Sequence, residues 1–101
     1  MDTNNDFELK AKELDEQATE SLKRLVKSMI VAKGYTMEKL AEELNKKYYT
    51  KESKANLSNK LKRGSLRFID FERILDILDY SFEIKHKNTV IEGVQNKSII
   101  L

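Results

Sequence analysis

With 101 residues, of which 40% are hydrophobic and 36% charged, the chain is long enough for one domain with a modest core. It has no cysteine and a single histidine, His86, so disulfide bonds are excluded and we expect neither a metal site nor a cofactor. Its apolar runs are far too short to span a membrane and no leader sequence opens the chain, so we expect a cytoplasmic protein.

The net charge of +2 hides an uneven distribution of charge along the chain. Residues 1–20 carry seven acids and two bases, residues 21–67 carry thirteen bases and four acids, and residues 68–101 carry four bases and six acids. Clustered lysine and arginine are typical of proteins that bind nucleic acid, because they displace counterions from phosphates. A lysine-rich solvated surface gives the same pattern.

Apolar residues recur every three or four positions from Phe7 to Lys33, which predicts one long helix. The stripe comprises Phe7, Ala11, Leu14, Ala18, Leu22, Leu25, Met29 and Ala32. Val26 and Ile30 widen it in the second half, as a helix that faces a core requires. The first half has a thinner stripe, so we expect residues 1–20 to form an acidic helical extension that projects from the domain or contacts a partner.

Three shorter helices are predicted after this long one. Gly34 ends the first helix, and Thr36 caps a second over residues 37–46 with Leu40, Ala41 and Leu44 buried. A linker without apolar periodicity, "KKYYTKES", precedes a third helix over 53–62, which ends at Gly64. A fourth helix, residues 69–78, presents Phe71, Ile74, Leu75 and Leu78 to the core.

After Asp79 the period of the apolar residues changes to two, which predicts a strand. Its apolar face carries Tyr80, Phe82 and Ile84. A second strand over 89–94, with a turn at 87–88, would complete a hairpin.

Short helices joined by tight turns, with a basic third helix ending in "KLKRG", indicate a helix-turn-helix domain. The stretches "LVKSMIVAKGYTMEKLAEELN" and "NLSNKLKRGSLRFIDFERILDILDY" resemble the Cro/repressor (XRE-type) DNA-binding family over about 22–80. The resemblance is to a small bacterial and phage subgroup. It implies a mainly α, lambda-repressor-like bundle of four helices over 21–80, with a long N-terminal helix and a C-terminal β-strand or hairpin.

The same resemblance implies sequence-specific binding of double-stranded DNA by a repressor-like transcription regulator of a bacterium or mobile element. The helix over 53–62 would read the major groove. Two features depart from the family pattern. Met37 stands where many members carry a glutamine that contacts phosphate, and the turn between the second and third helices is longer by about five residues.

With Leu57 and Leu61 directed inward, helical geometry places Asn59 on the opposite side of the third helix. Asparagine can pair with adenine through two hydrogen bonds, and alanine can contact a thymine methyl group. The candidate base-reading residues are Ala55, Asn56, Asn59, Lys60 and Arg63. The candidate phosphate contacts are Lys39, Lys46, Lys47, Lys51, Lys54, Lys62 and Arg67. An ordinary soluble helix with leucines inside has the same pattern.

We also expect a homodimer, because one helix-turn-helix reads few base pairs and such domains usually pair across two half-sites. The C-terminal segment 81–101 is the candidate dimerisation element, with Tyr80, Phe82 and Ile84 at the interface. Packing of the helical extensions is the alternative. There two segments of net charge −5 would repel, so the strand is favoured.

No paired carboxylates, glycine-rich phosphate loop or Ser/His/Asp set is present, so we do not expect an enzyme. Two other functions remain open from the sequence. The chain could be a protein-interaction module that keeps the helix-turn-helix fold without reading an operator, or an architectural, excisionase-like DNA protein.

Overall fold

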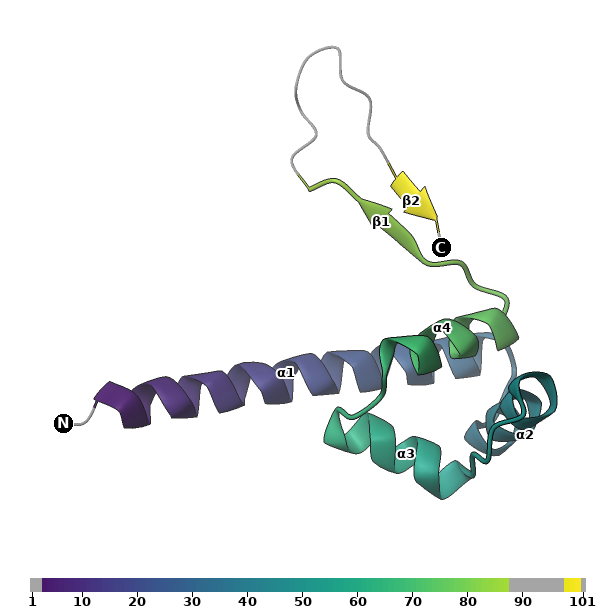
Figure 1. The fold of residues 1–101 in the computed structure, drawn as a ribbon, viewed down its shortest axis with the longest axis horizontal. Coiled ribbons are helices and arrows are strands. Elements are labelled where there is room, and N and C mark those ends of the chain that lie inside the picture. Colours follow the sequence, from purple (N-terminus) through teal and green to yellow (C-terminus); the bar gives the residue numbers. More distant parts are fainter. Residues whose placement is uncertain (1–2, 88–97, 101) are drawn as a thin grey trace, which may run out of the picture.

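The computed structural model describes residues 3–87 and 98–100, and it is mainly helical (Figure 1). The elements are α1 (Thr3–Ala32), α2 (Met37–Tyr48), α3 (Lys54–Arg63), α4 (Phe68–Ile77), β1 (Glu83–Lys85) and β2 (Ser98–Ile100). In Figure 1 the second half of α1 lies beside the other helices, and its first half extends beyond them. Among the described helices, none combines the length and the apolar character needed to cross a membrane.

One hydrophobic core joins all four helices. It comprises Val26, Met29 and Ile30 of α1, Leu40, Ala41 and Leu44 of α2, Leu57 and Leu61 of α3, and Ile74, Leu75 and Leu78 at α4. The predicted core residues of the second and third helices are therefore confirmed. Burying such side chains is the main favourable term in the folding of a domain of this size.

The core-facing side of α1 differs in part from the prediction. Val26 and Ile30 are buried, but Leu25 is 49% exposed and Ala32 is also exposed, so the prediction that these two face the core is wrong. Neighbouring residues of a helix point about 100° apart. Because Val26, Met29 and Ile30 are directed at the core, Leu25 and Ala32 fall outside the buried side of α1.

The turn from α1 to α2 follows the prediction. Gly34 has a positive φ of 70°, and the backbone N–H of Tyr35 donates to the carbonyl of Ile30 at 2.9 Å, which closes the end of α1. Thr36 accepts a hydrogen bond on its side-chain oxygen from the backbone N–H of Lys39 at 3.1 Å.

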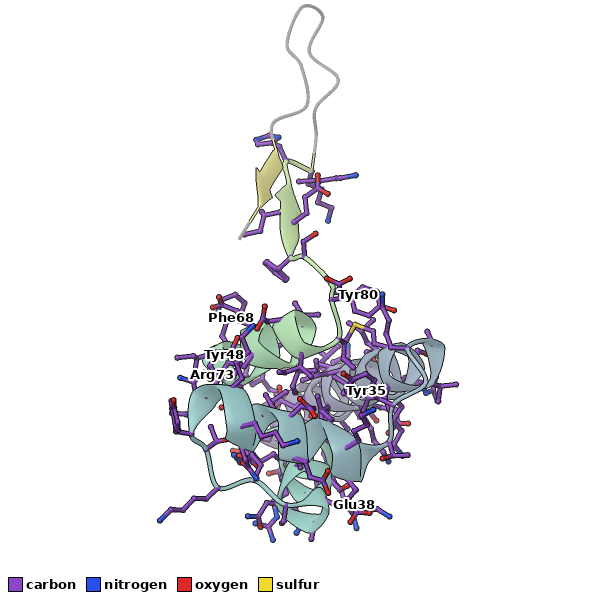
Figure 2. All side chains as sticks on the ribbon, turned by 90° about the vertical axis from the view of Figure 1, so that its right-hand side faces the viewer. Tyr35, Glu38, Tyr48, Phe68, Arg73 and Tyr80 are labelled. Carbon is purple, nitrogen blue, oxygen red and sulfur yellow. The ribbon has the colours of Figure 1, made fainter. Side chains whose placement is uncertain are left out.

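The end of α2 lies two residues beyond the predicted boundary at Lys46. Tyr48 is half-buried, its hydroxyl donates to Asp76 of α4, and the guanidinium of Arg73 lies 4.9 Å from its ring centre (Figure 2). These contacts with α4 stabilise the two residues that α2 has beyond the prediction. The turn before α3 therefore comprises residues 49–53, and most of the additional residues that the sequence placed in this turn belong to α2.

After α4 the chain leaves the helical body as the short strand β1. Phe82 packs edge-on against Phe68 and Phe71, with ring centres 5.5 Å and 6.2 Å apart. β1 pairs antiparallel with β2, and Ile84 lies opposite Ile99. The predicted strand over 89–94 lies outside the described residues, and the segment paired with β1 is 98–100.

Candidate nucleic-acid interface

Local contacts at both ends hold α3 in place. The N-cap Ser53 accepts a hydrogen bond from the backbone N–H of Asn56 at 3.0 Å. Gly64, at the other end, has a left-handed conformation with φ of 69°, which glycine adopts without a steric penalty. Leu57 and Leu61 are each 1% exposed. The helix is therefore confirmed to turn its leucines inward, and its opposite side faces out.

The outward side of α3 is exposed, and the helix carries no acidic residue. Its exposed residues are Lys54, Ala55, Asn56, Asn59, Lys62 and Arg63. The structure thus brings together four of the five candidate base-reading residues and two candidate phosphate contacts. Asparagine side chains offer both a donor and an acceptor, and the cations at the two ends of the helix offer positive charge.

Lys60 is the candidate base-reading residue that the structure places elsewhere. It is half-buried, and its ammonium group donates a hydrogen bond to the carboxylate of Glu52, whose side chain is 12% exposed. The pair joins α3 to the turn before it. It also neutralises a carboxylate beside α3 that would repel a phosphate group.

Asn45 organises the turn between α2 and α3. Its Oδ1 accepts hydrogen bonds from the backbone N–H of Glu52 at 2.7 Å and from the hydroxyl of Thr50 at 2.8 Å. Its Nδ2 donates to the carbonyl oxygen of Glu52 at 2.8 Å. One side chain therefore supplies the hydrogen-bond partners that the turn cannot find within itself.

α1 crosses α3 at the C-terminal end of α3. A Cβ atom placed on Gly64 would lie 2.6 Å from Oγ1 of Thr19, so the close approach of the two helices requires glycine there. Next to this crossing is a hollow of about 200 Å³ whose walls come from α1, α2 and α3. It is lined by Lys23, Lys27, Met37, Ser58, Asn59, Leu61 and Lys62. Three lysines from two helices therefore share one concave surface beside Asn59.

The candidate phosphate contacts differ in whether they form an ion pair. Four of them, Lys39, Lys51, Lys54 and Lys62, are exposed and form no ion pair within the described residues. Lys46 lies 3.6 Å from Glu43, one helical turn earlier, in an exposed pair that contributes little to stability. A surface pair of this kind leaves the lysine available to a phosphate.

Lys47 is held by α4. Its ammonium group donates to Oδ2 of Asp76, which also accepts from the hydroxyl of Tyr48. The bond from Lys47, and then the bond from Tyr48, lower the pKa of Asp76 below its ordinary value, and the same bond raises the pKa of Lys47. Lys47 therefore joins α2 to α4.

Arg67 caps α4. Asp70 accepts from the backbone N–H and from Nε of Arg67 on Oδ2, and from Nη2 on Oδ1, each at 3.1 Å. The side-chain bonds from Arg67 are the main cause of a lowered pKa for Asp70. The guanidinium group thus stabilises the start of α4, although 69% of the Arg67 side chain is still exposed.

The three candidate dimerisation residues have different surroundings. Phe82 is half-buried against its own chain, next to Phe68. Nζ of Lys33 lies 4.5 Å from the ring centre of Tyr80, and Ile84 is 45% exposed on β1. Phe82 is therefore already packed, while Ile84 remains accessible.

Reasoning from the sequence missed three residues of this region. Lys23 and Lys27 are four positions apart, which puts them on one side of α1. Only the packing of α1 against α3 shows that this side adjoins the outward face of α3. Asn45 was missed because its partners lie five and seven residues later in the turn.

Residues 18–81 match a protein family described as a domain of unknown function (DUF6471). The match begins just before Thr19, where α1 meets α3, and ends just before β1. No curated protein and no solved structure matches the chain. The geometry of the matched region is thus the basis for assigning a function.

Proposed function

We propose that the chain, which belongs to the DUF6471 family, binds double-stranded DNA with α3 in the major groove. The observation that carries this proposal is the outward face of α3. It is exposed, free of acids, and continuous with the hollow lined by Lys23, Lys27 and Lys62. Such a surface suits an anionic polymer whose base edges carry hydrogen-bond donors and acceptors.

The dimensions of α3 support the fit to a groove. A helix with its side chains is about 10–12 Å across, and the major groove is about 12 Å wide, so α3 can lie along the groove. Lys54 lies at the first position of α3, and Lys62 and Arg63 lie at its end. Cations at both ends of the helix would therefore lie near the two phosphate backbones that border the groove.

Base reading would fall to the residues between those ends. Asn56 and Asn59 are three positions apart, so they project from neighbouring points of one side of the helix. Each could bind an adenine through its N6 and N7 atoms, which distinguishes that base in the major groove. Ala55 is small enough to let the backbone of α3 approach the DNA, and its methyl group could contact a thymine methyl group. Arg63 could bind guanine.

Phosphate binding would extend from α3 to its neighbours. Lys62 would act with Lys23 and Lys27 around the hollow, and Lys51 in the turn would act with Lys54. Each phosphate neutralised releases counterions, so affinity should fall steeply as salt concentration rises. In this proposal α2 and α3 form the helix-turn-helix of a lambda-repressor-like bundle, in a cytoplasmic, repressor-like transcription regulator.

Fluorescence anisotropy with a duplex selected from a random pool, compared with unselected duplex, tests the proposal. Asn56→Ala and Asn59→Ala should each weaken binding to the selected duplex by about 1–3 kcal/mol and relax the preference for it. Lys62→Ala should weaken binding to all duplexes alike and reduce the salt slope by about one. Lys12→Ala, an exposed lysine on the projecting half of α1, is the control and should have little effect.

Each of the other outcomes has a definite meaning. No binding to any duplex would refute DNA binding and favour a protein-interaction module. Binding without preference between duplexes would refute sequence reading and favour an architectural protein. Unchanged preference in the folded Asn56/Asn59 double variant would show that α3 does not read bases.

A further inference from the structure

A second stripe of uncharged residues runs along the exposed surface of α1. Its members are Phe7, Ala11, Leu14, Ala18, Ser21, Leu25, Ser28 and Ala32, and every one of them is exposed. They follow alternating steps of four and three. The other exposed residues between 8 and 27 are all charged or glutamine, apart from Leu9. We call this stripe the α1 seam.

The α1 seam is separate from the core and lies beside the proposed DNA surface, with Lys27 between the two. Val26 and Ile30 face the core, whereas Leu25 is 49% exposed. Lys27, which lines the hollow beside α3, is two residues from Leu25 and so lies about 160° around the helix from it. A seven-residue repeat sustained over more than three heptads is typical of a helix that pairs with another helix.

We propose that the partner is a second copy of this chain, packed antiparallel along the α1 seam. With the two-fold axis between residues 19 and 20, Leu14 of one copy meets Leu25 of the other, and Ala18 meets Ser21. In the next layers Ala11 meets Ser28 and Phe7 meets Ala32. Small side chains near the axis allow the two helices to approach closely.

The charge distribution along α1 favours the antiparallel direction. Residues 3–20 carry six acids and two bases, a balance of −4, and residues 21–33 carry four bases and no acid, a balance of +4. An antiparallel pair places each acidic half beside the basic half of the other copy. A parallel pair would place the two acidic halves side by side, and these would repel each other.

The second half of α1 also presents a place for the partner's Phe7. A shallow hollow with mainly apolar walls is lined by Arg24, Lys27, Ser28, Val31 and Ala32. In this register the partner's Phe7 reaches that hollow. In the single chain, Phe7 and Val31 are each 76% exposed, and the pairing would cover both side chains. The strand offers less, because Phe82 already packs within its own chain.

The mass in solution tests the interface, and the test does not depend on DNA binding. Light scattering at micromolar concentration should give about twice the chain mass of 11.8 kDa. Leu14→Asp should halve that mass while circular dichroism shows a folded helical protein. Leu9→Asp is the matched control, because Leu9 is as exposed as Leu14, at 63%, but lies outside the seam; it should stay dimeric.

Cysteine cross-linking tests the direction, since the chain has no cysteine of its own. Ala11 and Ser28 are about 25 Å apart along one helix. A mixture of Ala11→Cys and Ser28→Cys proteins should form a disulfide between the two variants, and neither variant alone should cross-link.

Four results would overturn the proposal. Three are a wild-type mass of one chain, a Leu14→Asp protein that remains dimeric, and cross-linking of each cysteine variant with itself, which would indicate a parallel pair. A dimer that is lost when residues 81–101 are removed would place the interface on the strand instead.

Discussion

Replacing Asn45 by alanine should destabilise the domain through the turn before α3. The change removes two hydrogen bonds to the backbone of Glu52, at 2.7 Å and 2.8 Å, and one from Thr50 at 2.8 Å. All three residues are half-buried, so water replaces these bonds incompletely. A hydrogen bond contributes about 0.5–1.5 kcal/mol net, so the three together predict a loss of about 1.5–4.5 kcal/mol in the free energy of unfolding.

Urea unfolding followed by circular dichroism measures this loss, which should appear as a lower midpoint with an unchanged slope. Asn45→Asp keeps the acceptor oxygen but replaces the donor to the carbonyl of Glu52 by a carboxylate oxygen, which that carbonyl repels, so it should destabilise the turn as well. Asn59→Ala is the control: its side chain is exposed and makes no hydrogen bond within the described part of the chain. Equal midpoints for Asn45→Ala and Asn59→Ala would show that the turn does not depend on Asn45.

Three further changes test the packing and the caps. Leu57→Ala should cost about 2–5 kcal/mol of stability in urea unfolding, because Leu57 is fully buried, and a normal melting temperature would mean that α3 faces the other way. Asp70→Asn should cost about 1 kcal/mol at neutral pH. Because Arg67 lowers the pKa of Asp70 in the folded state, this stabilisation is present above the unfolded pKa of about 4 and is lost as pH falls below it. The difference from wild type in acid titrations of stability should therefore vanish at low pH, and a difference that persists there would contradict the role of the ionised carboxylate. Gly64→Ala should cost about 1–2 kcal/mol in thermal unfolding, because φ is positive and the new Cβ meets Thr19, and an unchanged melting temperature would refute the close approach.

The elements that the sequence predicted best are set by contacts within a few residues. Thr36 and Lys39 are three residues apart, and Gly34 ends α1 through bonds to the preceding turn. A cap depends on residue type and local spacing, and both can be read directly from the chain. The buried leucines of α3 were predictable for the same reason, since their spacing fits one helical side.

What escaped prediction depends on contacts between distant segments. The hydroxyl of Tyr48 donates to Asp76, which lies 28 residues later, and this contact holds the end of α2 that the prediction missed. Lys60 lies on α3 and Glu52 lies in the turn before it, so their pairing shows only once the turn is folded. On α1 two overlapping periodicities compete, and only the packed structure shows that Val26 faces the core while Leu25 faces out.

The continuity of α1 has a consequence for how its backbone exchanges hydrogen with solvent. The half beyond residue 20 is anchored by buried side chains, so its amide protons should exchange only when the whole domain unfolds. The half from residue 5 to residue 18 has only exposed side chains, and helices of that length are marginal by themselves in water. In a single copy its amides should therefore exchange by fraying, at rates that rise toward the N-terminal end of α1. Any partner that covers Phe7 and Leu14 would slow exchange in that half alone, so exchange rates along this one helix separate the stability of the fold from that of an assembly.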